Sequence, residues 1–288
     1  MKRLYDLPAP GKVNLFLHVV GRRDDGYHLL QSVFMLIDWC DTLHLERRSD
    51  GQIGREDTSA GDLPANDLCV RAARLLQSTT GTSDGVQITL DKHLPAQAGL
   101  GGGSSDAATV LLALNRLWSL GLSRSELIRL GQTLGADVPF FIGGHNAWVE
   151  GIGEQLTPIQ LPSGRLLVLK PPGGASTPQI FASPLLKRDT KTATIQGFAA
   201  NSTLDLAACM AFGSNDLQPV VQTLCPDVGA GIDWLAARGL NARMSGSGTA
   251  VFAPLPQGQS APGEAPEGWQ MRVCSNMDEH PLAGWCGD

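Results

Sequence analysis

The sequence contains no long uninterrupted run of apolar residues. No run reaches the length needed to span a membrane, and residues 1–8 lack the apolar core of a secretory signal peptide. These absences exclude an evident membrane segment or export signal. We therefore expect a cytoplasmic protein with no membrane partner.

Disulfide and metal-binding spacings are also missing. The six cysteines form no C-x-x-C pair, and the six histidines are scattered without an H-E-x-x-H or similar spacing. We expect reduced, mostly buried thiols and no transition metal held by the protein.

The sequence also contains fewer basic than acidic residues. The 22 Lys and Arg residues face 28 Asp and Glu residues, and the formal net charge is −6. A nucleic-acid-binding protein should instead show a basic excess or stripe. We therefore expect small-molecule partners and no nucleic acid.

The length of 288 residues suggests about two domains, which we place at residues 1–158 and 159–288. Strands and helices alternate in mixed order, which predicts an α+β fold. Strands are expected at residues 12–20, 29–38, 42–46, 86–90, 147–150, 165–170, 249–252 and 270–273. Helices are expected after Asn66 or Asp67, at 107–117, from the Ser123–Glu126 capping box to about 134, and at 227–238. Loops are expected at 47–64, 151–164 and 254–268.

A glycine-rich stretch at residues 94–106 connects a predicted strand to a predicted helix. Its glycines allow positive φ and a close approach to a ligand, and the helix behind them offers free N–H groups to an anion. Ser104, Ser105 or Asp106 could instead simply cap the helix. Because capping does not explain the glycines, we favour phosphate binding.

The spelling of this loop excludes three common phosphate-binding motifs. A P-loop requires a lysine after the glycines, and a Rossmann fingerprint requires glycine where Ser104 stands. A protein-kinase glycine loop lies at the start of its domain and not between a strand and a long helix. The stretch is therefore another kind of phosphate loop.

Three further clusters have plain explanations when each is taken alone. Lys12 and Asn14 share one face of a predicted strand, where lysine is usually a solvated edge residue. Asp137 comes shortly before Pro139, which favours a helix start, so it could be a local cap. Residues 245–248 form a Ser-Gly-Ser-Gly turn of a common type. Together with the phosphate loop, however, a cation and a carboxylate are what phosphoryl transfer to a hydroxyl requires.

These stretches carry a family resemblance. Residues 8–15 (PAPGKVNL), 95–108 and 245–248 resemble the three motifs of the GHMP kinases, which include galacto-, homoserine, mevalonate and phosphomevalonate kinases. The motifs DGYH at 25–28 and LGADVP at 134–139 are similar to those of members that act on a cytidine-diphosphate-linked methylerythritol. The resemblance implies a two-domain fold with the active site in the cleft between domains. It also implies ATP-dependent phosphorylation of the 2-hydroxyl of 4-diphosphocytidyl-2-C-methyl-D-erythritol, in non-mevalonate isoprenoid biosynthesis.

The resemblance assigns roles to individual residues. Asp137 matches a base toward the 2-hydroxyl, and Lys12 matches a group that holds Asp137 ionised and counters phosphoryl charge. Lys92 matches a residue near the adenosine. The ATP phosphate loop is matched by Pro95, Ala96, Gln97, Ala98, Gly99, Leu100, Gly101, Gly102, Gly103, Ser104 and Ser105. The substrate side is matched by Asn14, Tyr27, His28, Asp137, Thr177 and Phe181.

The substrate residues have implied contacts and also plain alternatives. Tyr27 would stack on cytosine, His28 would bond to its edge, and Asn14 would lie near the erythritol hydroxyls. Thr177 and Phe181 would line the nucleotide side. Without the resemblance, Tyr27 and His28 could be surface residues after a turn, and Phe181 a core residue.

Several questions stay open at the level of sequence. Mg²⁺ should accompany ATP, but its protein ligands are unassigned. A homoserine- or mevalonate-type kinase is an alternative, and so is a non-catalytic ligand sensor, although the presence of both Lys12 and Asp137 argues against a sensor. The chain departs from the family pattern at Asp67, where asparagine is common, at Pro171-Pro172, and in residues 254–268. The oligomeric state is open between a monomer and a weak homodimer.

Overall fold

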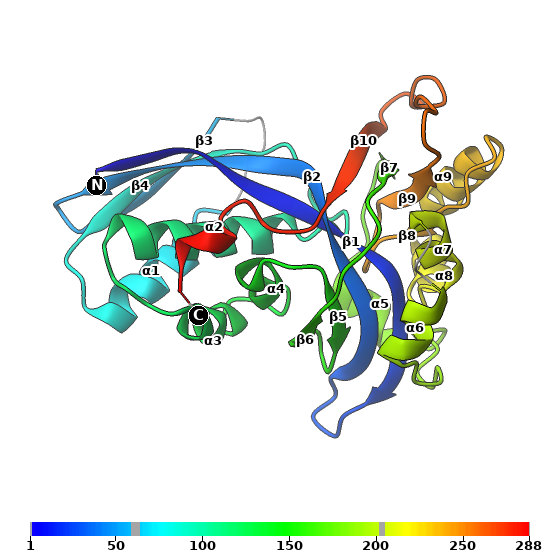
Figure 1. Cartoon of the computed structure of the whole chain (residues 1–288), viewed down its shortest axis with the longest axis horizontal. Coiled ribbons are helices and arrows are strands. Elements are labelled where there is room, and N and C mark those ends of the chain that lie inside the picture. The colour runs from blue at the N-terminus through cyan, green and yellow to red at the C-terminus, as the bar shows by residue number, and fades with distance from the viewer. Residues whose placement is uncertain (1, 59–63, 202–204, 288) are drawn as a thin grey trace.

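Two very long antiparallel strands run from one half of the molecule into the other (Figure 1). In the computed structural model, which describes residues 2–58, 64–201 and 205–287, β1 covers Arg3–Arg22 and β2 covers His28–Arg48. The two strands predicted at 29–38 and 42–46 are therefore one strand, and this prediction was wrong. The pairing shifts register between Pro10 and Gly11, so that a bulge takes up Asp38 and Trp39 without ending β2.

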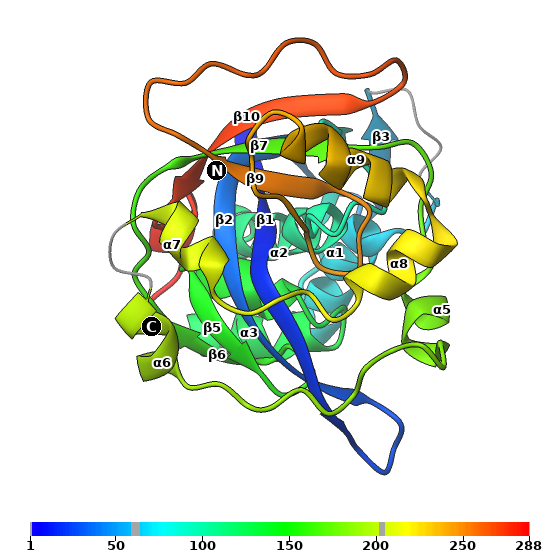
Figure 2. The ribbon, with the colours of Figure 1, turned by 90° about the vertical axis from the view of Figure 1, so that its right-hand side faces the viewer.

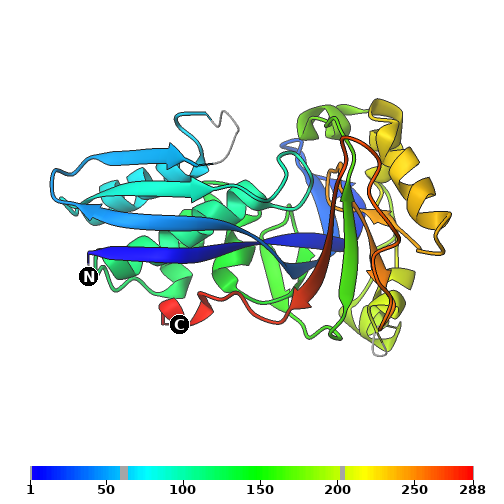
Figure 3. The same ribbon diagram turned by 90° about the horizontal axis from the view of Figure 1, so that it is seen from above.

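The first half adds helices and shorter strands to this pair. Its elements are β3 (Ile53–Asp57), α1 (Leu68–Thr80), β4 (Gly85–Asp91), α2 (Gly102–Leu117), α3 (Arg124–Gln132), α4 (Val138–Gly143), β5 (Ala147–Glu150) and β6 (Gln155–Pro158). Strand β2 pairs with β1, β4 and β5, and β3 runs parallel to β4 at the edge. Helices α1 to α4 lie on one face of this sheet, as Figure 3 shows from above. The apolar faces of α1 and α2 pack with the sheet into the first core cluster.

The second half is built on a sheet of its own. Its elements are β7 (Arg165–Lys170), α5 (Thr177–Ala182), α6 (Ile195–Asn201), α7 (Leu206–Ala211), α8 (Gln218–Leu224), α9 (Asp227–Ala236), β8 (Arg243–Met244), β9 (Val251–Leu255), β10 (Gln270–Met277) and the 3₁₀ turn Ala283–Trp285. The strand order is β10-β7-β9-β8, and helices α7 to α9 lie on the outer side (Figure 2).

The two sheets meet where β10 pairs with β2, through Asn276↔Ile37 and Met277↔Leu36. A core cluster between the halves combines β1 residues such as Phe16 with second-half residues such as Phe252. After β10 the chain returns to the first half, where Leu282 packs into the first core cluster. The long strands and this return make the halves one connected structure.

Most predicted elements are confirmed and a few are wrong. The α+β class, the helix after Asp67, the capping box at Ser123, and the strands at 86–90, 147–150 and 165–170 are confirmed. The loops predicted at 47–64 and 151–164 are wrong in part, because they contain β3 and β6; residues 59–63 lie outside the described part. Strand β9 begins at Val251 and runs to Leu255, and residues 256–269 form the expected irregular loop. No helix in the described ranges is long and apolar enough to cross a membrane.

Candidate active site

The glycine-rich loop leads from β4 into α2. Helix α2 begins at Gly102, earlier than the predicted residue 107, and Gly101 is its N-cap with a φ of 72°. No side chain caps this helix, so the interpretation of Ser104, Ser105 or Asp106 as a cap is wrong. The first-turn N–H groups have no acceptor within the helix, which leaves them as donors for an anion.

The Ser-Gly-Ser-Gly turn at 245–248 packs against this loop. The Ser245 hydroxyl donates to the Gly99 carbonyl oxygen at 2.9 Å and accepts from the Asn14 backbone N–H at 3.2 Å. A Cβ on Gly99 would lie 2.1 Å from the Ser245 carbonyl oxygen, so only glycine permits this approach. The turn belongs to the second half. Through Ser245 it holds the phosphate loop and β1 together.

Lys12 lies within β1 and is only 3% exposed, so its interpretation as a solvated edge residue is wrong. Its Nζ donates to Asn14 Oδ1 at 2.6 Å, lies 3.4 Å from Asp137 Oδ2 and lies 4.3 Å from the centre of the Phe34 ring. Its backbone N–H donates to the Leu100 carbonyl oxygen at 2.9 Å. The ammonium is therefore fixed beside the phosphate loop and screened from bulk water, where its charge acts strongly.

Asp137 immediately precedes α4, but its side chain makes no capping hydrogen bond. Asp137 thus occupies the N-cap position at a turn, as the local interpretation predicts, but it does not cap α4 through its side chain. Its side chain is 31% exposed and lines a cavity, while Oδ2 faces the Lys12 ammonium. This arrangement leaves a carboxylate oxygen available to a bound hydroxyl, with a cation next to it.

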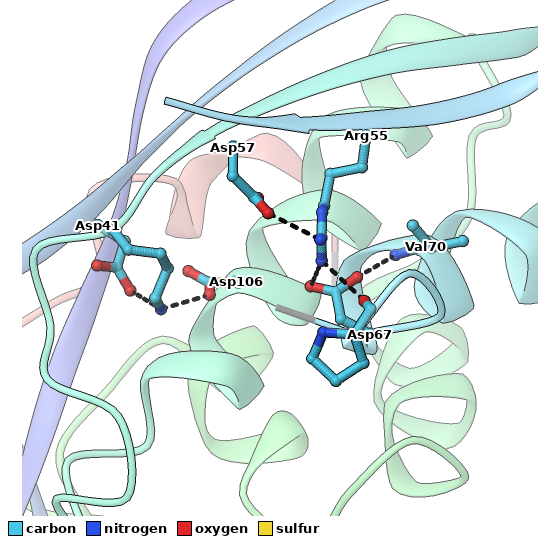
Figure 4. A network of polar contacts seen from close by, with 8 residues as sticks. Asp41, Arg55, Asp57, Asp67, Val70 and Asp106 are labelled. Atoms are coloured by element: carbon cyan, nitrogen blue, oxygen red, sulfur yellow. Dashed lines mark hydrogen bonds and ion pairs between the residues drawn. The ribbon is translucent and has the colours of Figure 1, made fainter. Parts of the chain in front are cut away.

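Close to Gly102 at the start of α2, the Lys92 ammonium contacts both Asp41 and Asp106. Figure 4 labels the two carboxylates and marks both contacts with dashed lines. The Lys92 Nζ lies 2.8 Å from Asp106 Oδ2, and a Cβ on Gly102 would lie 3.3 Å from the same Nζ. Asp41 Oδ1 accepts the backbone N–H groups of His93 and Leu94 at 2.6 and 2.7 Å. Lys92 thus packs against the start of α2, next to the loop. The prediction that it lies near the adenosine stays a prediction.

The charges of this buried group are not balanced. Burial and the neighbouring Asp41 raise the pKa of the Asp106 carboxyl to about 8, although Lys92 opposes the change. For Lys92, burial lowers the pKa of the ammonium, but the two carboxylates outweigh burial and the pKa is raised. Within the described part of the chain, Asp106 Oδ1 has no hydrogen-bond partner. Burial and the neighbouring Asp41 thus favour the protonated form of the Asp106 carboxyl.

Asp67, which departs from the family pattern, has two partners in the structure (Figure 4). Its Oδ1 accepts the Val70 N–H at 3.1 Å and so caps α1, and its Oδ2 lies 2.7 Å from Arg55 Nη1. Arg55 also pairs with Asp57 on β3 at 2.9 Å. An asparagine would keep the cap and lose the ion pair, so Asp67 links α1 to the edge strand.

A cavity of about 320 Å³ opens between the two halves, where the sequence predicts the site. Its walls include Lys12, Asn14 and Asp137 from the first half and Thr177 and Gly246 from the second. A second cavity of about 570 Å³ adjoins it. The two share the lining residues Leu30, Ala136, Ile152, Thr177 and Phe181. A ligand with two distinct ends could therefore occupy both.

The second cavity is lined by the predicted cytidine residues. The rings of His28 and Phe181 stack with their centres 4.9 Å apart and their planes 29° apart. Tyr27 is 60% exposed on the same wall. The Thr177 hydroxyl lies 2.9 Å from the Ser247 hydroxyl, which connects α5 to the third motif.

The predicted phosphate-loop residues differ in how they relate to the smaller cavity. Those that line the smaller cavity are Gly99, Gly101 and Ser104. The carbonyl groups of Gln97 and Ala98 accept N–H groups just after the Ser-Gly-Ser-Gly turn, at 3.1 and 3.0 Å. The side chains of Leu100 and Ser105 are buried, so these residues face a ligand only through backbone. The loop therefore acts mainly by its main chain.

Sequence reasoning missed Arg188. Its Nε donates to His28 Nε2 at 3.0 Å, across 160 positions of sequence. The pKa of His28 is lowered by burial and by the positive charges of Arg188 and Arg22. Arg188 stands in an irregular stretch without a motif, so no local signal identifies it.

Two family matches cover parts of both halves. Residues 67–145 match the GHMP kinases N terminal domain, and residues 194–265 match the GHMP kinases C terminal domain. The first match spans α1, the phosphate loop, α2 and Asp137.

Curated relatives extend the likeness over the whole chain. The 4-diphosphocytidyl-2-C-methyl-D-erythritol kinase of a Polaromonas species is 60% identical, over 99% of this chain and 95% of the relative. The kinase of the same name from Paracidovorax citrulli is 60% identical over 100% and 99%. A crystal structure of 4-(cytidine 5'-diphospho)-2C-methyl-D-erythritol kinase is 35% identical with a TM-score of 0.71, and the match covers 89% of this chain and 90% of that one.

Proposed function

This chain belongs to the GHMP kinase family, and we propose that it transfers the γ-phosphoryl group of ATP to the 2-hydroxyl of 4-diphosphocytidyl-2-C-methyl-D-erythritol. The relatives that are 60% identical over nearly the full chain are kinases of that substrate. The structural observation that carries the proposal is the pair of adjoining cavities. One holds a cation and a carboxylate beside a phosphate loop, and the other has an aromatic wall.

The phosphates of ATP bind at the glycine-rich loop and the first turn of α2. The free N–H groups there point to an anion, and the positive end of the helix dipole favours it. Ser245 and Gly99 keep the loop in this shape. The loop holds the phosphates through backbone donors, so it needs no lysine of its own.

Mg²⁺ enters with ATP in this proposal. Among the described residues no group of three or more His, Cys, Asp or Glu side chains is placed to hold a metal ion. Mg²⁺ commonly binds substrate phosphates with few protein ligands, and Ser104 is the loop hydroxyl that lines the cavity. When bound, the ion would offset the negative charge of the phosphates.

Asp137 and Lys12 perform the chemistry on the acceptor side. Asp137 accepts the hydrogen bond of the 2-hydroxyl and takes its proton as the new O–P bond forms. Lys12, held by Asn14 at 2.6 Å and 3.4 Å from Asp137 Oδ2, places positive charge next to the moving phosphoryl group. Since the Lys12 ammonium is held by Asn14 before the substrate binds, its charge needs little reorganisation.

The second cavity distinguishes this reaction from the alternatives. Homoserine and mevalonate have no nucleotide group to occupy a space of about 570 Å³ with an aromatic wall. A non-catalytic sensor would not need the Lys12–Asp137 pair. We also place the reaction in the cytoplasm, with ATP and the CDP-linked substrate as the small-molecule partners.

A coupled assay of ADP release tests the proposal. The protein is given Mg²⁺ and ATP with 4-diphosphocytidyl-2-C-methyl-D-erythritol, homoserine or mevalonate in separate reactions. We expect ADP release only with the first acceptor. Turnover of homoserine or mevalonate in its place would overturn the substrate assignment, and ATP binding without turnover of any acceptor would favour the sensor.

A further inference from the structure

The guanidinium group of Arg188 is almost fully occupied with backbone contacts. Its Nη2 donates to the carbonyl oxygens of Phe181 and Ser183 at 3.0 and 2.7 Å, and its Nη1 donates to that of Leu186 at 2.9 Å. These bonds fix the plane of a rigid donor group. One Nη1–H and the Nε–H are left; the Nε–H has a direction set by these bonds, and it points to His28 Nε2 at 3.0 Å.

This contact determines where the proton of His28 lies. Arginine carries only donors and stays charged, so His28 Nε2 must present a lone pair to it. A neutral imidazole that accepts at Nε2 carries its proton on Nδ1. An imidazolium, which has a proton on both nitrogens, cannot accept the bond at all.

The proton on Nδ1 is then available to a ligand. His28 lines the cavity of about 570 Å³, and its stacking partner Phe181 forms the adjoining wall. Within residues 2–58, 64–201 and 205–287, the ring of His28 forms a hydrogen bond through Nε2 and none through Nδ1. His28 therefore brings a hydrogen-bond donor of fixed tautomer to the aromatic wall of the cavity.

We propose that Arg188 is a positioning residue that holds His28 in the Nδ1–H tautomer, so that the site selects cytosine over uracil. The inference rests on the proposed function, which places the cytidine group in this cavity. Cytosine offers an acceptor at ring nitrogen N3, whereas uracil carries a proton there. A fixed Nδ1–H donor forms a hydrogen bond to N3 of cytosine. With uracil it would face the N3–H group, which is a second donor.

The surrounding charges act in the same direction. The charged groups near His28 are Arg188 and Arg22, and Asp25 on the adjacent turn also lines the cavity. Burial and the two arginines lower the pKa of His28, which keeps the imidazole neutral at physiological pH. Arg22 donates through its own Nε to the Gly26 carbonyl oxygen at 3.1 Å, so it contributes charge near His28 without bonding to it.

The ¹⁵N spectrum of His28 in the unmodified protein tests the tautomer directly. The two ring nitrogens give distinct signals when protonated and unprotonated, and a His28→Gln variant assigns them. We expect Nδ1 protonated and Nε2 unprotonated at neutral pH. A proton on Nε2, whether in the Nε2–H tautomer or in the imidazolium, overturns the proposal without any change to Arg188.

Binding of CDP and UDP tests the consequence for selectivity. Calorimetry is performed with a non-hydrolysable ATP analogue present to fill the ATP site. We expect the unmodified protein to prefer CDP by about tenfold or more, the worth of one well-made hydrogen bond. Arg188→Met, which cannot donate, should lose most of that preference, whereas Arg188→Lys, which keeps a donor, should retain part of it.

Arg22→Met is the matched control, because it removes a nearby positive charge and leaves the His28 bond intact. It should change CDP and UDP binding together and keep their ratio. If Arg188→Met also weakens both nucleotides equally, Arg188 only supports the loop and the proposal is wrong. If the unmodified protein neither turns over the CDP-linked substrate nor prefers CDP, the proposed function itself has failed instead.

Discussion

Two opposing effects act on the Asp106 carboxyl, and burial wins. The Lys92 ammonium, 2.8 Å away, favours the charged carboxylate and acts to lower its pKa. Burial and the neighbouring Asp41 instead raise its pKa from 3.8 to about 8, a change on the order of 5 kcal/mol. A single ammonium, Lys92, is shared by two carboxylates, and Asp41 has the better hydrogen bonds.

Replacing Asp106 with asparagine should therefore change the pH dependence of stability. Because the folded protein holds a proton that the unfolded chain releases above pH 4, the wild type loses free energy of unfolding as pH rises toward 8. The loss is at most about 1.4 kcal/mol per pH unit, and Asp106→Asn lacks it. Urea unfolding of both proteins at pH 5, 6.5 and 8 measures the difference. A difference that does not vary with pH would show that Asp106 is ionised.

The residues of the site were predictable to different degrees from sequence. Lys12 and Asp137 are far apart in the sequence, and only the family resemblance predicted that their side chains lie together. The distance of 3.4 Å between Lys12 Nζ and Asp137 Oδ2 confirms that they do. Composition alone favoured an exposed Lys12. Asp41 and Arg188 were missed because each acts through a contact between distant segments that no local pattern records.

At the scale of elements, regular patterns were predicted well and irregular ones were not. Helix α1 and the capped helix α3 have clear starts and apolar faces. Strand β2 was divided in the prediction because a bulge breaks its alternation near Asp38. Strand β3 has a polar sequence, and its edge position beside β4 tolerates that. The short helices α5 to α8 were not predicted, since each has too few turns to show a periodic face.

The contact between the phosphate loop and the Ser-Gly-Ser-Gly turn can be tested with one methyl group. In Gly99→Ala the added Cβ would lie 2.1 Å from the Ser245 carbonyl oxygen, at a φ of 73°. We expect the loop to shift, ATP affinity to fall by about a hundredfold or more, and stability to drop by more than the roughly 1–2 kcal/mol that positive φ alone costs. Calorimetry with ATP and urea unfolding measure the two effects.

Gly121→Ala is the matched control, since its φ is 70° and its added Cβ meets nothing within 4 Å. It should show the conformational cost and no effect on ATP binding. Equal destabilisation of Gly99→Ala and Gly121→Ala, with ATP affinity retained in both, would mean that the contact between Gly99 and Ser245 accommodates a side chain.

At the scale of the whole molecule, the site exists because two sheets share long strands. Strands β1 and β2 carry Lys12, Asn14 and His28 into the space between the halves. The second half closes that space with α5 and the turn at 245–248. The two-domain α+β architecture was predictable from the motifs, whereas the return of the chain end to the first half was not. The boundary between residues 158 and 159 stays a prediction.

The rate of phosphoryl transfer in a single turnover tests the central claim most directly. Wild-type protein and Asp137→Asn are mixed with labelled ATP, Mg²⁺ and 4-diphosphocytidyl-2-C-methyl-D-erythritol and quenched at short times, with Asp233→Asn on the exposed face of α9 as a control. We predict that Asp137→Asn binds both ligands within a few-fold of wild type but transfers phosphate about 10²–10⁴ times more slowly, and that the control is unaffected. Transfer at the wild-type rate by Asp137→Asn would contradict the account.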